Sequence, residues 1–178
     1  LSLYHQSDII RNYFKDTFLG MELEYAIEES PLGTGGAIVN SFKKITNDHV
    51  YVLNGDTLLD LNFFDVEMQW KKFNLNIVVL KEIDDLARYG CVEVEGAYIK
   101  SFSEKNKIGK GLINAGVYVL RSDFFSEAQC KNSFSFEKDF LHKAVKEKKI
   151  SYYISNNFFI DIGIPDDYKK AQILLSWF

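Results

Sequence analysis

The sequence predicts an α/β fold: a mixed, mostly parallel sheet flanked by helices, with a small antiparallel insertion. Up to Leu80, short apolar runs alternate with amphipathic helical segments in the order β-α-β-α-β-α-β, which is typical of a parallel sheet with right-handed crossovers. Two alternating runs, Cys91–Glu95 and residues 98–102, then flank Gly96 and Ala97, which predicts a hairpin. A chain of 178 residues is long enough to bury a core of its own.

The elements of the N-terminal part follow from apolar spacing and from helix and turn signals. Residues 1–4 are typical of the tail of a strand. Ser7 or Asp8 is placed to cap a helix whose apolar residues recur at helical spacing, and Gly20 is a suitable end for this segment. The pattern then predicts a strand over 22–27, a helix capped by Thr34, a strand over 50–53, a helix over Phe63–Phe73 and an apolar strand over 76–80.

The C-terminal part adds short strands and helices. A strand over 111–120 is interrupted by Asn114, Ala115 and Gly116. The remaining predicted elements are a short helix beginning at Phe124 and Phe125, a helix capped by Ser135 and reaching about Lys146, strands over 150–154 and 158–160, and a helix over 166–177 that Pro165 starts. Because no repeat, low-complexity tract or linker occurs, residues 1–178 are predicted to form one domain.

Charge and cysteine content argue against several classes of protein. A formal net charge of −4 gives no electrostatic reason to expect a nucleic acid or an anionic membrane as a partner. No apolar run approaches the roughly 18 residues of a membrane-spanning helix. Cys91 and Cys130 lack metal-ligand spacing, which favours a reduced, cytoplasmic protein. Because His5, His49 and His142 are scattered, neither a zinc site nor a histidine-based triad is predicted.

The segment 29–56 carries the strongest functional signal. Its glycine-rich GTGGA turn, with Thr34 at a helix-capping position, lets a ligand approach the backbone and leaves first-turn amides free as donors. The following apolar strand ends at Asn54, Gly55 and Asp56, and ligands of open α/β sheets bind at that edge. A glycine pair alone is equally typical of an ordinary loop, but together with a strand-terminal carboxylate it favours a ligand site.

A second aspartate, Asp161, also ends an apolar strand and has a glycine close behind it. If both strands belong to one sheet, Asp56 and Asp161 face the same crevice. Two carboxylates together with substrate phosphates are a usual way to hold Mg²⁺, which retains several waters and prefers octahedral oxygen ligation. Either aspartate alone also fits a helix cap or a turn. As a pair, they predict a magnesium site.

Three weaker signals point to a sugar phosphate. Glu104 accepts hydrogen bonds from hydroxyls while Lys105 meets the phosphate charge, although this sequence is also typical of a solvated turn. Asn114 lies inside an apolar strand, where it needs a buried partner or a ligand. Tyr89 and Gly90 open a strand, and Gly90 is equally typical of a simple turn.

These segments, in this order, resemble the sugar-1-phosphate nucleotidyltransferases, also called sugar-nucleotide pyrophosphorylases. Any one motif is weak, but they occur in family order over nearly the whole chain. The GTGGA loop and the FIDIG ending are most similar to the branch that contains D-glycero-α-D-manno-heptose 1-phosphate guanylyltransferase. The matching motifs are ESPLGTGGA at 29–37, LNGD at 53–56, YG at 89–90, FSEK at 102–105, INAGVYVL at 113–120, SFEKDFL at 135–141 and FIDIGIPDDY at 159–168.

The resemblance implies a Rossmann-like enzyme fold and a defined reaction. A sugar 1-phosphate attacks the α-phosphorus of an NTP and releases pyrophosphate. For this branch the substrates are GTP and heptose 1-phosphate, and the product, GDP-heptose, would serve the synthesis of surface polysaccharide. By motif, the implied metal ligands are Asp56 and Asp161, which with Lys105 form the catalytic group; the nucleotide contacts are Leu32, Gly33, Thr34, Gly35, Gly36, Asn54 and Gly55; and the sugar-phosphate contacts are Tyr89, Gly90, Glu104, Lys105 and Asn114.

Two departures from the family pattern qualify this hypothesis. Asn106 stands where the family has the proline of its EKP motif, which loosens the turn that aims Lys105. The GxGTRLxPxT loop that opens the fold and holds the NTP phosphates has no counterpart here. We therefore expect that about one βαβ-sized segment is missing upstream of Leu1, and that the chain as printed lacks part of the catalyst.

Other functions remain open at this stage. The chain could be a sugar-nucleotide-binding or regulatory module without catalysis, or a transferase that uses UTP or dTTP with a hexose 1-phosphate. A glycosyltransferase also combines an α/β sheet with acidic metal ligands, but it usually has a DxD-type pair, and Asp84-Asp85 lies in a polar turn. The predicted partners are small molecules, with a homo-oligomer left open.

Overall fold

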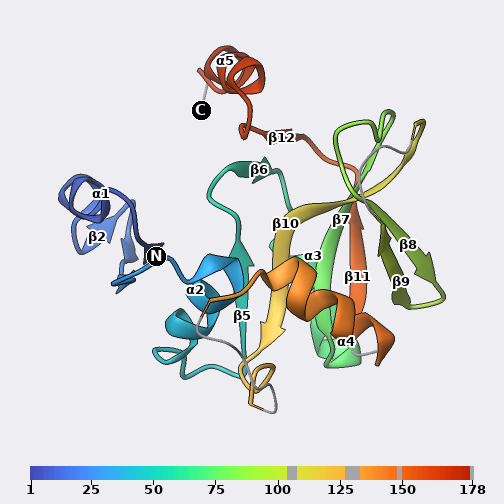
Figure 1. Cartoon of the computed structure of the whole chain (residues 1–178), viewed down its shortest axis with the longest axis horizontal. Coiled ribbons are helices and arrows are strands. Elements are labelled where there is room, and N and C mark those ends of the chain that lie inside the picture. Colours follow the sequence, from blue (N-terminus) through green and yellow to red (C-terminus); the bar gives the residue numbers. More distant parts are fainter. Residues whose placement is uncertain (104–107, 127–132, 148–149, 177–178) are drawn as a thin grey trace. The chain divides into compact units, whose positions relative to one another are not determined.

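The computed structural model describes residues 1–103, 108–126, 133–147 and 150–176 (Figure 1). They fall into two compact units, one formed by residues 1–48 and 122–143 and the other by residues 49–121 and 144–178. The predicted mixed α/β class is confirmed.

The second unit is built on a six-stranded sheet with the order β5-β10-β7-β11-β9-β8. Its strands are β5 (His49–Leu53), β7 (Asn76–Ile83), β8 (Cys91–Glu95), β9 (Tyr98–Ser103), β10 (Gly111–Arg121) and β11 (Ile150–Ser155). β7 and β11 pair in parallel, and β10 is antiparallel to both β5 and β7. Strands β5, β7 and β11 therefore run in one direction, with β10 reversed between β5 and β7.

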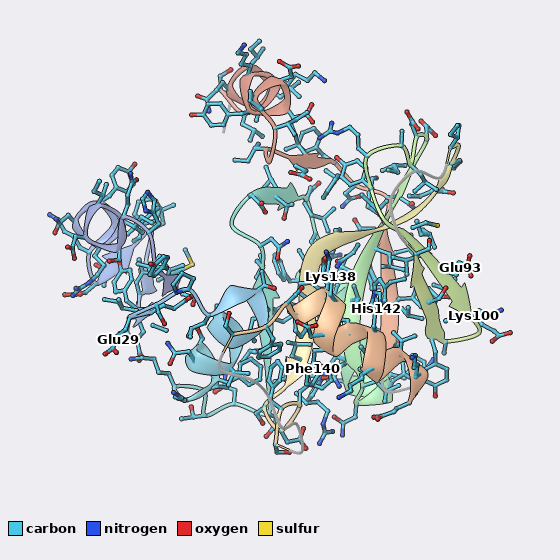
Figure 2. The ribbon with its side chains drawn as sticks, in the orientation of Figure 1. Glu29, Glu93, Lys100, Lys138, Phe140 and His142 are labelled. Carbon is cyan, nitrogen blue, oxygen red and sulfur yellow. The ribbon has the colours of Figure 1, made fainter. Side chains whose placement is uncertain are left out.

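The predicted insertion is the hairpin β8–β9, whose strands pair antiparallel and join this sheet beside β11. Figure 2 shows Glu93 and Lys100 projecting from its two strands, and both residues are exposed. Gly96 in its turn has a positive φ of 59°, a conformation that glycine adopts without strain. The hairpin turn therefore lies where the sequence placed it.

The core of the second unit lies between its sheet and α3 (Phe63–Phe73). The first five residues of β7 are fully buried, as expected for a strand covered on both faces. Asn62 caps α3 by accepting a hydrogen bond from the Phe64 amide at 3.1 Å, which explains why the helix begins where the apolar spacing predicted. The core cluster formed by this helix and the sheet consists of Leu61, Val66, Ile77, Val79, Val117 and Val119.

Three further elements complete the second unit. The short strand β6 (Thr57–Leu59) was not predicted, and it pairs antiparallel with β12 (Phe159–Asp161). Helix α5 (Pro165–Leu174) follows, with Pro165 in its first turn as predicted. In the described ranges, no helix is long and apolar enough to cross a membrane.

The first unit contains short strands and an aromatic cluster. β1 (Ser2–Leu3) pairs in parallel with β4 (Ala26–Ile27), and β2 (Thr17–Phe18) forms a hairpin with β3 (Met21–Glu22). Its helices are α1 (Ser7–Phe14), α2 (Gly33–Phe42) and the π-helix η1 (Phe136–Leu141), which continues into α4 (His142–Lys146). Phe140, labelled in Figure 2, packs in η1 against the rings of Phe124 and Phe125 at centroid distances of 4.8 and 4.7 Å.

Several predicted boundaries in the first unit are wrong, because tertiary contacts decide them. Gln6, not Ser7 or Asp8, is the N-cap of α1. The predicted strand over 22–27 is two separate strands, since the Leu23 amide turns back to the Asp16 carbonyl at 2.9 Å. Residues 122–126 form turns and not a helix, because their phenylalanines serve the aromatic cluster. The predicted cap at Ser135 is confirmed by its hydrogen bond from the Lys138 amide at 3.2 Å.

Candidate functional site

The two predicted metal ligands lie at adjoining positions of the β6–β12 ladder. Asp161 is paired with Thr57, and the Ile162 amide donates to the backbone carbonyl of Asp56 at 2.9 Å. Asp56 lies in the turn between β5 and β6, and β12 follows β11 after a short connection. The chain therefore brings together two strand-terminal aspartates that are far apart in sequence.

Both carboxylates keep the capacity to bind a cation. Within the described ranges, nothing hydrogen-bonds or ion-pairs with the exposed Asp56 carboxylate. One oxygen of Asp161, Oδ1, accepts from the Gly163 amide at 2.7 Å. No group of three or more His, Cys, Asp or Glu side chains able to hold a metal occurs among the residues described. The donor set fits Mg²⁺, which takes one or two protein carboxylates and completes its shell with water and substrate phosphates.

A bulge in β10 places Gly116 beside the end of β5. The register of β10 against β7 shifts between Asn114 and Tyr118, and Gly116 has a φ of +73°. The backbone N–H of Asn54 donates to the Gly116 carbonyl at 2.8 Å. A Cβ on Gly116 would lie 2.8 Å from Thr57 Oγ1 and 2.9 Å from Asn54 Nδ2, so glycine is required for these side chains to approach. The bulge thus lets Gly116 bond to both Asn54 and Asn114.

The Asn114 side chain already has partners inside the protein. Its Oδ1 accepts from the Gly116 amide at 3.0 Å, and its Nδ2 donates to the Tyr118 hydroxyl at 2.8 Å. A polar side chain half-buried in a strand needs such partners. These bonds hold the Asn114 side chain in a defined orientation.

Tyr89 and Gly90 lie where the chain enters β8. The Tyr89 ring packs edge-on against Phe159 of β12 with a centroid distance of 6.4 Å, and burial raises the pKa of the Tyr89 phenol. A Cβ on Gly90 would lie 2.9 Å from the Ser103 carbonyl, so Gly90 permits close packing of β8 on β9. Glu104 and Lys105, predicted to follow β9, lie outside the described residues.

The glycine-rich turn belongs to the first unit and differs from its prediction. Leu32, not Thr34, is the N-cap of α2, and Thr34 Oγ1 instead accepts from the Phe136 amide at 2.9 Å. The Gly35 amide is not free, because it donates to the Phe134 carbonyl at 3.0 Å. A Cβ on Gly33 would lie 2.6 Å from that carbonyl, and one on Gly35 would lie 2.1 Å from the Phe134 ring. These glycines therefore make room for a protein segment.

One ion pair near Asp161, between Arg88 and Asp167, was not predicted from the sequence. Arg88 Nη1 donates to Asp167 Oδ2 at 2.5 Å, and it keeps the pKa of Asp167 below its ordinary value. The available signal was weak, since Arg88 only precedes the Tyr-Gly motif and Asp167 reads as an acidic residue in a first helical turn.

Comparison with known proteins decides the family. The model of the family described as nucleotidyl transferase matches residues 1–176, almost the whole chain. The chain belongs to the nucleotidyl transferase family. The predicted resemblance is therefore confirmed, and the relatives compared include sugar-phosphate guanylyltransferases.

Two relatives in this nucleotidyl transferase family carry the same name, D-glycero-alpha-D-manno-heptose 1-phosphate guanylyltransferase. The protein from Aneurinibacillus thermoaerophilus is 39% identical over 173 residues, covering 97% of this chain and 75% of its own length. The protein from Campylobacter jejuni is 43% identical over 171 residues, covering 94% of this chain and 74% of its own.

A solved structure shows the same fold. The crystal structure of HddC from Yersinia pseudotuberculosis superimposes with a TM-score of 0.88 at 34% identity, covering 98% of this chain and 77% of that protein. The same protein complexed with GMP-PN matches with a TM-score of 0.85.

Proposed function

We propose that the protein transfers GMP from GTP to D-glycero-α-D-manno-heptose 1-phosphate, making GDP-heptose and releasing pyrophosphate. The observation that carries this proposal is the 39% and 43% identity to two proteins of that activity over at least 94% of the chain. The adjoining aspartates of the β6–β12 ladder support it, since phosphate transfer needs charge neutralisation where the phosphates meet.

In this reaction, an oxygen of the sugar 1-phosphate forms a bond to the α-phosphorus of GTP. The bond from that phosphorus to the oxygen bridging the β-phosphate breaks, and pyrophosphate leaves with the electron pair. Asp56 and Asp161 would hold Mg²⁺, which when bound neutralises phosphate charge and orients the reacting groups. The chain's own contribution is mainly positioning.

We assign the remaining contacts by motif. Base and ribose lie against Leu32, Gly33, Thr34, Gly35 and Gly36, with Asn54 and Gly55 nearby in sequence to Asp56. The sugar hydroxyls contact Tyr89, Gly90, Glu104 and Asn114, and Lys105 meets the sugar phosphate. The bonds of Asn114 to Gly116 and Tyr118 support its part in this assignment, because they fix the orientation of its side chain.

The test is a substrate panel with the full-length protein, scored by pyrophosphate release. GTP, UTP and dTTP are each combined with heptose 1-phosphate and with hexose 1-phosphates. We expect turnover with GTP and heptose 1-phosphate, and loss of it when EDTA removes Mg²⁺. Turnover only with UTP or dTTP would contradict the base assignment. Binding of GDP-heptose without turnover would show a regulatory module.

We also propose that the two units form one cytoplasmic nucleotidyltransferase domain. One family model matches residues in both units, and Cys91 is a free thiol, as reducing conditions favour. Coincident urea transitions in far-UV circular dichroism and in tryptophan fluorescence are expected for a single cooperative unit. Two separated transitions would contradict it.

A further inference from the structure

Arg88 connects the segment before β8 to the first turn of α5. Its guanidinium donates to the Asp167 carboxylate, whose side chain is only 11% exposed. The other oxygen of Asp167, Oδ1, accepts from Lys170 Nζ at 3.0 Å. Because Lys170 lies on the same helix as Asp167, its bond joins no separate elements. Arg88 is therefore the partner through which Asp167 reaches another part of the fold.

The segment that carries Arg88 is anchored on both sides. The buried Leu86 donates its amide to the Gly109 carbonyl at 3.0 Å, and the Tyr89 amide donates back to the Leu86 carbonyl at 3.0 Å. The Arg88 guanidinium lies over the Tyr89 ring at 5.5 Å from its centroid, an arrangement that planar arginine favours over lysine. The orientation of Tyr89 thus depends on where Arg88 is held.

The Tyr89 ring also contacts the strand that carries Asp161, one of the two proposed metal ligands. The Tyr89 ring packs on Phe159 of β12, the strand that ends at Asp161. The hydrogen bond to Asp167 raises the pKa of Arg88, and the nearby charge of Asp161 adds to this effect. The segment before β8 therefore contacts the start of α5 through Arg88 and strand β12 through Tyr89.

We propose that Arg88 and Asp167 form a positioning pair that holds Tyr89 and Gly90 at the Asp161 edge and thereby aligns the sugar 1-phosphate. This inference rests on the proposed function, which places the sugar against Tyr89 and Gly90. The pair acts through its neighbours and need not touch the substrate. Because a misplacement of 1 Å can cost about 100-fold in rate, a loosened segment weakens use of the sugar phosphate.

The first experiment measures KM for each substrate in Arg88→Gln and Asp167→Asn, with Lys170→Ala as the matched control. We expect KM for the sugar 1-phosphate to rise about tenfold in both variants, which is less than the ~100-fold that a 1 Å misplacement can cost. KM for GTP should change less than about twofold. The control removes the exposed partner of the same carboxylate, so it should leave both constants near their starting values. Arg88→Lys retains the charge and should give an intermediate rise.

The double variant distinguishes a pair from two independent residues. If Arg88 and Asp167 act together, the combined substitution raises the sugar-phosphate KM no further than either single one. Additive rises would contradict the pairing. Equal rises in both KM values together with a lowered Tm would show a merely structural role and overturn the proposal.

Amide hydrogen exchange provides a readout that does not depend on turnover. In Arg88→Gln, the amides of residues 84–90 should exchange faster, whereas those of the central strand β7 should not change. Unchanged exchange in residues 84–90 would overturn the inference. No turnover by the wild-type protein with any substrate pair would instead contradict the proposed function, and with it the role in sugar alignment, while faster exchange would still show that Arg88 holds the segment.

Discussion

The two ends of strand β5 have opposite electrostatic arrangements. At its start, His49 and Tyr51 lie against α3, where His49 Nε2 is 2.8 Å and the Tyr51 hydroxyl 3.3 Å from Glu67 Oε2. Lys71 Nζ lies 3.5 Å from the other oxygen of Glu67, Oε1. At the other end, Asp56 lies exposed and has no such partner among the residues described.

The physical cause is the position of each carboxylate relative to the sheet. Glu67 projects from a helix that covers the sheet face, so burial raises its pKa, but hydrogen bonds and charges from His49 and Lys71 outweigh burial and lower it overall. Asp56 lies beyond the edge of the sheet, where water solvates it. A carboxylate is available to a ligand where the fold leaves it unpaired, and the two ends of β5 separate these cases.

The largest expected effect is on catalysis, at the end of β5 that leads to Asp56. Asp56→Asn and Asp161→Asn should each lower kcat/KM for pyrophosphate release about 100-fold or more, because each removes charge from the proposed metal site. Stability should stay within about 0.5 kcal/mol of the wild type for the exposed Asp56. The control is Glu67→Gln, whose activity per folded molecule should not change. A comparable loss of activity in Glu67→Gln would contradict the view that only the unpaired carboxylates take part in catalysis.

The next largest effect is on stability, at Gly116, which lies beside Asn54 just after β5. Gly116→Ala should destabilise the protein by about 2–4 kcal/mol, since it combines a positive φ with contacts below 3.0 Å to Thr57 and Asn54. Gly96→Ala is the matched control, because Gly96 also has a positive φ but open space around it, so about 1–2 kcal/mol is expected. Urea denaturation measures both. Equal losses would show that backbone strain alone decides the effect.

Near the start of β5, where Glu67 binds His49 and Tyr51, Glu67→Gln should lower the free energy of unfolding by about 1–3 kcal/mol, as expected for hydrogen bonds to a charged group. The lowered pKa of Glu67 makes this contribution depend on pH. It is fully present above the ordinary value of 4.5 and decreases as pH falls below 4.5 through the lowered folded pKa. Urea titrations at pH 7 and at about pH 3 should therefore show a smaller difference between wild type and variant in acid. A constant difference would contradict the pairing.

The smallest effect is a spectroscopic shift. Burial raises the pKa of Tyr51 to about 12, with the charge and hydrogen bond of Glu67 adding to it. In Glu67→Gln this pKa should fall toward the ordinary value of 10.0, because a neutral amide no longer opposes phenolate formation. The difference in ultraviolet absorbance between wild type and variant during alkaline titration measures the shift, with Tyr51→Phe identifying the signal. An unchanged titration would show that burial alone sets this pKa.

Local patterns in the sequence were sufficient for the elements that depend on local forces. Helix α3 and strand β8 have their predicted bounds, since apolar spacing, an asparagine cap and a glycine turn act within a few residues. The candidate metal ligands were also recognisable, because Asp56 and Asp161 each end an apolar strand. Family membership followed from motifs in order along the chain, and the family match confirms it. The metal-binding role of the two aspartates stays a prediction.

What local patterns could not supply is the identity of distant partners. The sequence alone determined an α/β nucleotidyl transferase with strand-terminal aspartates. Only the tertiary structure decided that β6 and β12 pair to bring Asp56 and Asp161 together, and that Asp167 is bound by Arg88. It likewise decided that Gly35 donates to Phe134. Each of these depends on which groups meet once the core has formed, and burial then favours a partner for most polar groups that lose water.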